Sequence, residues 1–517
     1  MKHLLNLHVL VLGLGDSGLA MARWCAANGA VVSVWDTRAQ PPQAAALAQH
    51  VPSVAMLSGP LTEASFQGIQ LVLKSPGLSP LDERISAPLA ASGLSVQSEL
   101  DLFARALLDL NADRGYAPKV LAITGTNGKT TTTSMAALLI ARTGKRVAMA
   151  GNIGPTMLQS LADALNPADA DADADAASAA LPEVWVLELS SFQLDHVQHF
   201  EPNAGVVLNL SEDHLDWHGN MAAYMAAKAR VFGGQAVMVI NRDDAAVERL
   251  VPAPVQGKGR FAKPIQRTIV RFGTSEPTLP GDFGLKVENG IPWLVRALEA
   301  DDSIKRSRKD VEVEALHIQR LMPADALRVR GRHNAANALA ALALATSIDC
   351  PLAPMLHALR DYAGEPHRVQ FIATVGGVDA FDDSKGTNVG ATVAAIHGLG
   401  ADRSPSKLVL ILGGDGKGQD FAPLAAPVQQ HARAVATIGR DAGLIESALA
   451  SCGVTVHRFE TLQAATRWAY SRAQTGDAVL LSPACASLDM FRNYGHRAEV
   501  FVAEVQAVAA DQGEVIA

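Results

Sequence analysis

The segment with the clearest chemical signature is a glycine-rich loop between an apolar run and a helical pattern. It reads GTNGKTT at residues 125–131 and follows the apolar run Val120 to Ile123. Backbone N–H groups at such a helix start can surround phosphate oxygens, while a lysine and a hydroxyl suit the β- and γ-phosphates and a magnesium ion. Ile123 stands where the common GxxxxGK[ST] motif has its first glycine. The segment therefore predicts a compact ATP-phosphate loop containing Lys129 and Thr130.

Two further polar segments come directly after apolar runs in the same part of the chain. Glu188 follows Val184 to Leu187, and the acidic and histidine residues 212–214 follow Val206 to Leu208. The carboxyl ends of parallel strands are where α/β sheets bind ligands, and magnesium prefers hard oxygen ligands. We therefore expect Glu188 to approach a magnesium ion, with an exposed loop acid as the simpler alternative. Taken alone, a histidine such as His214 is better explained as a structural residue.

A second glycine motif lies near the start of the chain. The sequence GLGDSG at residues 13–18 follows the apolar run Val9 to Leu12, and Asp36 follows the next run, Val31 to Trp35. In nucleotide-binding folds these glycines let the backbone approach a pyrophosphate, and the acid holds a ribose. A tight strand-to-helix turn without a ligand explains the motif alone equally well. The motif also does not identify the nucleotide.

Short apolar runs alternate with alanine-rich helical stretches along the whole chain. Besides the runs named above, Leu71 to Leu73, Leu408 to Leu412 and Ala478 to Leu481 are predicted to be buried strands. This alternation predicts an α/β fold with mostly parallel, doubly wound sheets.

The chain of 517 residues is too long for a single hydrophobic core, which favours three domains. We place them at residues 1–107, 108–364 and 365–517. Asp169 to Ala180 and Arg296 to Pro323 lack a clear apolar pattern, and we expect both to be insertions without a catalytic role.

Composition excludes several classes of function. The net charge is -8 and the sequence has no basic stripe, which argues against a nucleic acid partner. The four cysteines form no CxxC pair, so the sequence does not indicate a zinc site. Four scattered free thiols are typical of a protein in a reducing compartment. No uninterrupted apolar stretch reaches the roughly 18 residues of a membrane span. The apolar N-terminal run is broken by Asn6 and His8, unlike a secretory signal, so we expect a cytoplasmic protein.

Together these motifs resemble the Mur ligases, which add amino acids to the peptide stem of the bacterial cell-wall precursor. The resemblance rests on the 125–130 loop, the phrases around Glu188 and His214, Lys228, and the phrases GRHNAAN at 331–337 and PHR at 366–368. Phrases at 383–388 (DSKGTN), 413–417 (GGDGK) and 482–489 (SPACASLD) are similar to those of the D-glutamate-adding branch. The likeness covers almost the whole chain apart from the two expected insertions.

The resemblance implies a Rossmann-like N-terminal domain, a central P-loop ATPase-like domain and a Rossmann-like C-terminal α/β domain. It also implies a monomer that acts on UDP-N-acetylmuramoyl-L-alanine and D-glutamate, with ATP and two magnesium ions. The residues expected to bind the UDP substrate are Ser17, Asp36, Thr37, Arg38, Gly77 and Asn152. Those expected to contact ATP are Gly125, Thr126, Asn127, Gly128, Lys129, Thr130, Thr131, Asn334, Asn337, Arg368 and Asp383. Those expected to hold D-glutamate are Lys385, Thr387, Lys417, Ser487, Leu488 and Tyr494. The metal ligands would be Thr130, Glu188, His214 and a carbamylated Lys228, and the catalytic residues Lys129, His214 and Lys228.

Some positions depart from the family pattern. Asp16 lies inside the N-terminal glycine motif, Gly386 stands where alanine is common, and Tyr494 stands where phenylalanine is common. These departures concern substrate contacts, not the reaction. By its local sequence alone, Lys228 would be a solvated surface lysine.

The implied reaction transfers the γ-phosphoryl group of ATP to a carboxylate, and the amine of D-glutamate then displaces phosphate from the acyl phosphate. Three alternatives stay open. An NAD-dependent dehydrogenase would use the N-terminal motif but leaves the phosphate loop unexplained. A nucleotide switch leaves the lysine- and serine-rich third domain unexplained. A sibling Mur ligase or a folylpolyglutamate-type ligase would take another amino acid, and only resemblance argues against it.

Overall fold

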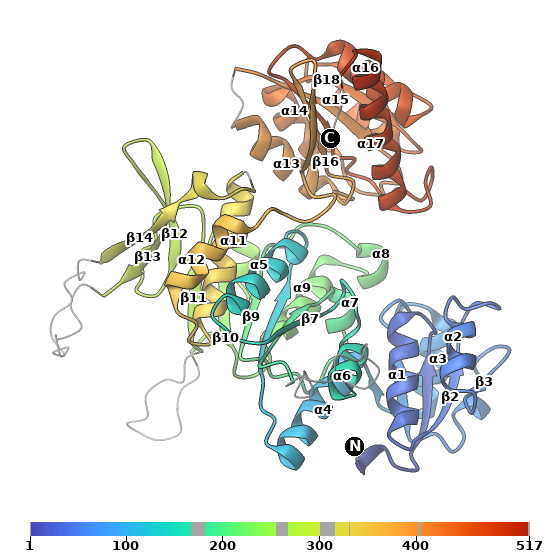
Figure 1. Ribbon diagram of the computed structural model, residues 1–517. Helices are drawn as coiled ribbons and strands as arrows, with labels where there is room; N and C mark the ends of the chain where they lie inside the picture. The colour runs from blue at the N-terminus through green and yellow to red at the C-terminus, as the bar shows by residue number, and fades with distance from the viewer. Residues whose placement is uncertain are drawn as a thin grey trace. The chain divides into compact units, whose positions relative to one another are not determined.

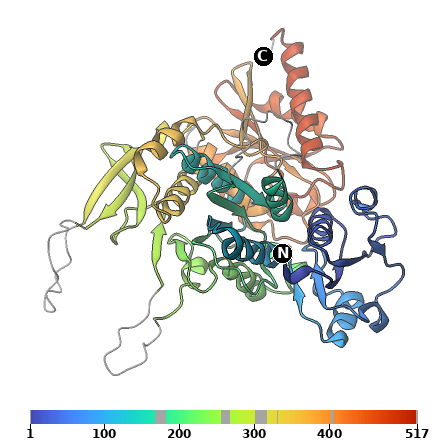
Figure 2. The ribbon, with the colours of Figure 1, turned by 60° about the horizontal axis from the view of Figure 1, so that its bottom comes forward.

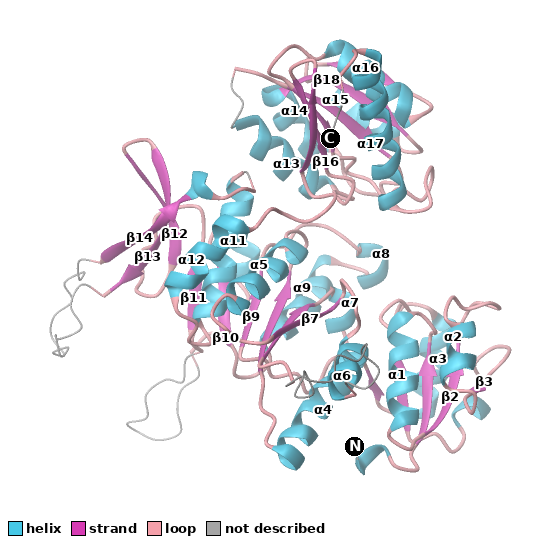
Figure 3. Ribbon diagram, viewed as in Figure 1, coloured by secondary structure: helices cyan, strands magenta, loops and turns pink. Residues whose placement is uncertain are grey.

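The structure is a computed structural model that describes residues 2–166, 181–254, 267–299, 316–329, 331–401 and 405–514. It divides into two compact units, one formed by residues 1–322 and 337–359 and the other by residues 323–336 and 360–517 (Figure 1). In each, sheets of mostly parallel strands are covered by helices (Figure 3). The fold class predicted from the alternating pattern is therefore confirmed. None of the helices in the described ranges combines the length and the hydropathy needed to span a membrane.

The first unit begins with a five-stranded parallel sheet of order β3-β2-β1-β4-β5. Its strands are β1 (His8–Leu12), β2 (Val31–Trp35), β3 (Ala55–Met56), β4 (Leu71–Lys74) and β5 (Val96–Gln97). Its helices are α1 (Asp16–Ala27), α2 (Ala44–His50) and α3 (Glu83–Ser92). The apolar residues of β1 are buried on both faces, as expected for a central parallel strand. This is the doubly wound, Rossmann-like domain that the sequence predicts.

Helix α4 (Glu99–Arg114) leads from this sheet to the next one and spans the boundary predicted after residue 107. The side chain of Ser98 caps its first turn through a capping box with Asp101, and Gly115 ends it in the left-handed conformation. Phe103 of α4 packs edge-on against Trp185, with ring centroids 5.2 Å apart. The helix therefore shares a core with the second sheet.

The second sheet has six parallel strands in the order β11-β10-β9-β6-β8-β7. Its strands are β6 (Lys119–Thr124), β7 (Val147–Gly151), β8 (Val184–Glu188), β9 (Ala204–Val207), β10 (Val237–Asn241) and β11 (Ile269–Phe272). The helices of this part are α5 (Lys129–Ala141), α6 (Met157–Leu165), α7 (Ser191–Leu194), α8 (Leu215–His218), α9 (Met221–Ala229), α10 (Ala245–Glu248), α11 (Arg332–Thr346) and α12 (Leu352–Asp361). The predicted insertion Asp169 to Ala180 lies outside the described residues.

A small third sheet, β12-β13-β14, follows β11. Its strands are β12 (Phe283–Glu288), β13 (Ile291–Leu298) and β14 (His317–Pro323), with β12 and β13 antiparallel. Ala297 and Met322 are buried. The expectation that Arg296 to Pro323 has no core pattern is therefore wrong at both ends, because residues 296–298 continue the middle strand β13 and residues 317–323 form β14, where polar and apolar residues are mixed. Residues 300–315 lie outside the described ranges.

The second unit contains a six-stranded sheet of order β15-β16-β20-β17-β18-β19, parallel except for β15. Its strands are β15 (Gln370–Val375), β16 (Val378–Asp382), β17 (Leu408–Gly413), β18 (Ala432–Ile438), β19 (Thr455–Arg458) and β20 (Ala478–Leu481). Its helices are α13 (Val389–Ala401), α14 (Ala425–His431), α15 (Ala442–Leu449), α16 (Leu462–Arg472) and α17 (Tyr494–Asp511), the long red helix of Figure 2. Across the described ranges, each of the eight predicted strands is present.

Candidate active site

The predicted phosphate loop connects β6 to α5, and its backbone can be built only with glycine at two positions. Gly125 and Gly128 have φ angles of +155° and +82°. A Cβ on Gly128 would lie 2.6 Å from Asn337 Oδ1, and a Cβ on Gly125 would lie 2.9 Å from the Cβ of Leu208. The loop is thus packed against the end of β9 and against α11, as a strand-to-helix phosphate loop requires.

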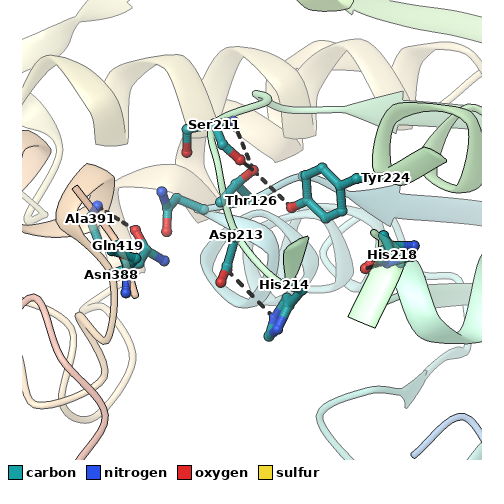
Figure 4. Close-up of polar contacts among 12 residues, drawn as sticks. Thr126, Ser211, Asp213, His214, His218, Tyr224, Asn388, Ala391 and Gln419 are labelled. Carbon is teal, nitrogen blue, oxygen red and sulfur yellow. Dashed lines mark hydrogen bonds and ion pairs between the residues drawn. The ribbon is translucent and has the colours of Figure 1, made fainter. Parts of the chain in front are cut away.

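The segment after β9 holds this loop in place. The backbone oxygen of Asn209 accepts a hydrogen bond from the Thr126 N–H at 3.0 Å, and its Oδ1 accepts one from the Asn127 N–H at 2.8 Å. The Thr126 hydroxyl accepts from the Ser211 N–H at 3.0 Å and lies 3.0 Å from the Tyr224 hydroxyl (Figure 4). Sequence reasoning did not assign a role to Asn209 or Tyr224. A polar residue directly after a buried strand was the available signal for Asn209.

Two lysine ammonium groups converge on one carbonyl of the loop. Lys129 Nζ donates to the carbonyl oxygens of Gly125 and Thr126, both at 2.9 Å. Lys228 Nζ, from α9, donates to the same Gly125 oxygen at 2.8 Å and to Thr124 Oγ1 at 3.2 Å. The two cations are therefore placed at the phosphate loop by residues about 100 positions apart in the chain.

Lys228 is not the surface lysine that its local sequence suggests, since it is only 1% exposed. Burial lowers its pKa well below the usual value, and the charge of Lys129 lowers it further, whereas Asp213 and Glu188 act to raise it. A larger share of its amine is therefore neutral than in an exposed lysine. A neutral amine is a nucleophile and an ammonium is not.

Glu188 ends β8 and is 1% exposed. Its Oε1 accepts from Asn152 Nδ2 at 2.8 Å, and its backbone oxygen accepts from the Asn152 N–H at 2.8 Å. Its Oε2 is buried and has no hydrogen-bond partner in the described part of the chain. An ionised oxygen with unsatisfied lone pairs is costly to bury, and a hard divalent cation is the ligand that would satisfy it. Glu188 therefore fits a magnesium ion.

The other predicted metal ligands are arranged less closely. His214 has a φ angle of +55° and precedes α8, and its Nε2 lies 3.5 Å from Asp213 Oδ2 (Figure 4). In the described ranges, no group of three or more His, Cys, Asp and Glu side chains is arranged to hold a metal ion. Thr130 is buried in the first turn of α5. His218 is a structural histidine, because it contacts Ser191 Oγ at 2.9 Å and burial lowers its pKa to about 4.

The N-terminal glycine motif also has a forced geometry. A Cβ on Gly18 would lie 1.9 Å from the carbonyl oxygen of Gly13, so only glycine fits. Asp36 accepts from the Leu14 N–H at 2.6 Å and pairs with Arg38 at 2.8 Å. Burial acts to raise the pKa of Asp36, but these hydrogen bonds outweigh it and lower the pKa to about 2. The carboxylate is thus occupied within the motif, and the half-exposed Arg38 is the charged group presented there.

The remaining predicted UDP-site residues lie near this motif. Thr37 and Gly77 follow β2 and β4, which flank β1, so both lie at the carboxyl edge of one sheet. Ser17, at the start of α1, lies beside the buried side chain of Glu99; burial raises the pKa of Glu99, and the Ser17 hydroxyl acts to lower it. Glu99 Oε1 in turn accepts from the Leu158 N–H at 3.0 Å, in the first turn of α6.

In the second unit, Asn334 and Arg368 line a cavity of about 560 Å³ together with Phe371 and Phe381. Asp383 is buried nearby, and Ser482 Oγ donates to its Oδ2 at 2.6 Å. Burial raises the pKa of Asp383 to about 7, although Ser482 and Arg368 act to lower it.

The residues predicted to hold D-glutamate lie on loops after three neighbouring strands, β16, β17 and β20, except for Tyr494, which begins α17. Asp415 and Ala486 exchange backbone hydrogen bonds of 3.0 and 2.8 Å, which joins the GGDGK loop to the SPACASLD loop. Lys385 Nζ lies 5.4 Å from the ring centre of Tyr494. At the end of the DSKGTN loop, the Ala391 N–H donates to Asn388 Oδ1 (Figure 4). The Val389 N–H donates to Gln419 Oε1.

The other members of this set occupy the same edge of the sheet. Thr387 belongs to the DSKGTN loop after β16, Lys417 to the GGDGK loop after β17, and Ser487 and Leu488 to the loop after β20. Leu488 is 72% exposed and Ser487 is buried.

Comparison with known proteins covers the same three regions. Residues 7–97 match the Mur ligase MurD-like N-terminal domain, residues 123–345 the Mur ligase middle domain, and residues 367–485 the Mur ligase glutamate ligase domain. The chain belongs to the Mur ligase family. The UDP-N-acetylmuramoylalanine--D-glutamate ligase of Albidiferax ferrireducens is 55% identical over 516 residues, covering 99% of this chain and 98% of the relative. The ligase of the same name from Burkholderia mallei is 54% identical over 519 residues, covering 98% of each chain.

Solved structures of other Mur ligases share the fold at low sequence identity. The MurF ligase of Thermotoga maritima in complex with ADP gives a TM-score of 0.55 at 17% identity, covering 98% of this chain and 100% of that one. The UDP-N-acetylmuramate-alanine ligase MurC of the same organism gives 0.53 at 19% identity, covering 97% and 99%. The predicted three-domain Mur ligase architecture is confirmed.

Proposed function

We propose that this Mur ligase uses ATP to join D-glutamate to UDP-N-acetylmuramoyl-L-alanine, forming ADP and phosphate during peptidoglycan precursor synthesis. The observation that carries the chemistry is the convergence of Lys129 and Lys228 on the Gly125 carbonyl, in the domain that also holds the unsatisfied buried oxygen of Glu188. Full-length relatives bearing that ligase name, at 54–55% identity, support the choice of substrates.

ATP would bind with its phosphates on the 125–131 loop. The N–H groups at the start of α5 face the phosphates, and Lys129 neutralises charge on the transferring γ-phosphoryl group. Asn337, which lies against Gly128, would contact the nucleotide from α11. Asn334, Arg368 and Asp383 would complete its site.

Glu188, Thr130 and His214 would hold magnesium, which when bound supplies positive charge to the phosphoryl oxygens. Lys228 would be carbamylated. Its neutral amine attacks carbon dioxide, an N–C bond forms and one proton leaves, so a neutral amine becomes a carboxylate-like anion that can contribute to a second magnesium site. The low pKa and the burial of Lys228 support this modification.

The N-terminal domain would hold the UDP part of the precursor, with Arg38 facing its anionic groups. The loops that carry Lys385, Thr387, Lys417 and Ser487 would hold D-glutamate, since ammonium and hydroxyl donors suit its two carboxylates.

The reaction follows from these placements. The carboxylate of the L-alanyl group attacks the γ-phosphorus of ATP, the bond to the β–γ bridging oxygen breaks, and ADP leaves. The amine of D-glutamate attacks the resulting acyl phosphate, gives up a proton, and phosphate leaves as the amide forms. Positional isotope exchange in ATP with no D-glutamate present tests for the acyl phosphate.

Phosphate release from ATP with UDP-N-acetylmuramoyl-L-alanine, with each candidate amino acid tested separately, decides the function. Release that depends on D-glutamate is the expected result. Lys129→Ala should abolish it, and Lys119→Ala, at the exposed opposite end of β6, should not. Release with L-lysine, diaminopimelate or L-alanine instead would keep the ligase and overturn the choice of amino acid. No release with any of them from folded protein would refute the proposal.

We also propose a cytoplasmic monomer. Its four cysteines are all free and buried, which is compatible with a reducing compartment. Light scattering of the purified protein tests the oligomeric state.

A further inference from the structure

Arg497 is a fully buried cation that the proposed chemistry does not use. It lies in the first turn of α17 and is 0% exposed, which makes it one of the largest fully buried side chains among the described residues. Its Nη2 donates to the carbonyl oxygen of Ser384 at 2.7 Å, and its Nη1 donates to the carbonyl oxygen of Cys485 at 3.1 Å. The guanidinium therefore bridges two loops that are about 100 residues apart in the sequence.

The partners of this guanidinium are unusual for a buried arginine. A buried arginine ordinarily pairs with a carboxylate, because an uncompensated charge is expensive to bury. In the described part of the chain, no carboxylate lies within ion-pair distance of Arg497, and its Nε has no hydrogen-bond partner. Burial lowers the pKa of Arg497 to about 10, although Cys485 and the more distant acids Asp489, Asp382 and Asp383 act to raise it, so it still carries its charge at neutral pH. The fold retains a costly charge to hold two carbonyl groups.

The two carbonyls belong to the loops on which the D-glutamate residues lie. Ser384 directly precedes Lys385 in the loop after β16, and Cys485 lies two residues before Ser487 in the loop after β20. These strands are hydrogen-bonded neighbours, so both loops leave the same edge of the sheet. Tyr494 lies on α17 three residues before Arg497. The planar fork, carried by α17, thus links the loops after β16 and β20, whereas Lys417 lies on a further loop, after β17.

The chemistry of the fork suits this task. A guanidinium presents donors in a fixed plane, so two carbonyls bound to its two Nη atoms are held at a fixed separation. A lysine in its place keeps the charge but has a single nitrogen on a flexible stem. Because the side chain is fully buried, Arg497 cannot touch the substrate. It can act only through the loops and through the field of its charge.

We propose that Arg497 is a positioning residue for D-glutamate: it fixes the spacing of the two carboxylate-binding loops and places a positive charge beneath them. The inference rests on the proposed function, and it names a determinant of amino-acid binding that lies outside the binding residues themselves. A site for two carboxylates needs donors at a fixed separation, and this arginine sets that separation.

Steady-state kinetics of the full chain test the proposal with Arg497→Lys and Arg497→Met. We expect the KM for D-glutamate to rise at least ten-fold in Arg497→Met and by a smaller factor in Arg497→Lys. The KM for the UDP precursor should stay within about two-fold of the starting protein, because its proposed residues all precede residue 153 and lie on other loops. The KM for ATP should rise less than the KM for D-glutamate, because Asp383 is the one proposed ATP residue that lies on a bridged loop. If Arg497→Met does not fold, Arg497→Lys alone decides: a rise in the D-glutamate KM that exceeds any rise in the other two KM values supports the role, and no such selective rise overturns it.

Arg433→Met is the matched control. Arg433 is a part-buried arginine of the same sheet that pairs with Asp477, at the opposite end of β20 from the substrate loops. Its loss should lower the melting temperature without a selective rise in the D-glutamate KM.

The outcomes separate clearly. An unchanged D-glutamate KM in folded Arg497 variants, equal rises in all three KM values, or the same selective rise in Arg433→Met would each overturn the positioning role. A starting protein without D-glutamate-dependent phosphate release would instead overturn the proposed function.

Discussion

Replacing Gly128 with alanine should carry two energetic costs, and a comparison with Gly144→Ala separates them. The first is backbone strain: alanine at a φ of +82° costs about 1–2 kcal/mol. The second is contact, because the new Cβ would lie 2.6 Å from Asn337 Oδ1, so that oxygen must move by several tenths of an ångström. Gly144 isolates the first cost, since its φ is +88° and nothing lies within 4 Å of its Cβ position.

Both variants should therefore lose stability through the strained backbone, but only Gly128→Ala should also impair ATP use. We expect Gly144→Ala to lower the unfolding free energy by about 1 kcal/mol with an unchanged KM for ATP. Gly128→Ala should lose at least ten-fold in kcat/KM for ATP, because Asn337 is displaced and a misplacement of about 1 Å can cost about a hundred-fold. Phosphate release against ATP concentration gives these constants, and urea unfolding gives the stabilities.

A double-mutant cycle tests the assigned cause. If Gly128→Ala acts by displacing Asn337, its effect on kcat/KM should shrink in an Asn337→Ala background, with a coupling of about 1 kcal/mol or more. Additive effects would refute the reasoning, because the glycine and the asparagine would then act independently.

Three further outcomes are expected. Glu188→Gln removes the charge on a buried oxygen that has no partner among the described residues, so magnesium should no longer raise the melting temperature in a thermal-shift assay, whereas Glu183→Gln, at a partly exposed position, should respond normally. Because burial raises the pKa of Asp383 from 3.8 to about 7, the folded state binds more protons than the unfolded state between these values, and stability falls as pH rises through that window. Asp383→Asn should flatten this part of a stability–pH curve, and an unchanged slope would exclude Asp383 as its source. Since all four thiols are buried, Ellman's reagent should find no fast-reacting cysteine before unfolding, and a rapid burst would show an open thiol.

The strands that could be predicted from the sequence are those with an unbroken apolar run. β1, β6, β17 and β20 are buried on both faces, so their sequences carry the signal directly. The small β12-β13-β14 sheet was not predicted because its strands contain charged residues, such as Lys286 and Arg320, between the apolar ones. None of these three strands is therefore an unbroken apolar run. The phosphate loop was predictable because its glycines and its lysine are adjacent in sequence.

The parts of the site that could not be predicted depend on packing between distant segments. Nothing around Lys228 in the sequence shows that α9 packs its side chain under the Gly125 carbonyl. The bridge made by Arg497 between the loops after β16 and β20 is likewise visible only once the sheet order is known. Local patterns identify elements and loops, whereas the burial of a single charge is a property of the assembled fold.

The two hydrogen bonds that Lys129 makes within its own loop have a consequence for selectivity. A ligand that recruits this ammonium must compete with the carbonyl oxygens of Gly125 and Thr126. A neutral oxygen, such as a sugar hydroxyl, accepts a hydrogen bond from Lys129 that is no stronger than the one a carbonyl accepts. Replacing a carbonyl by such an oxygen therefore gains little free energy. A phosphate oxygen carries negative charge and forms a stronger bond to the same donor. The contacts within the loop therefore favour ligands that bring negative charge over uncharged ones.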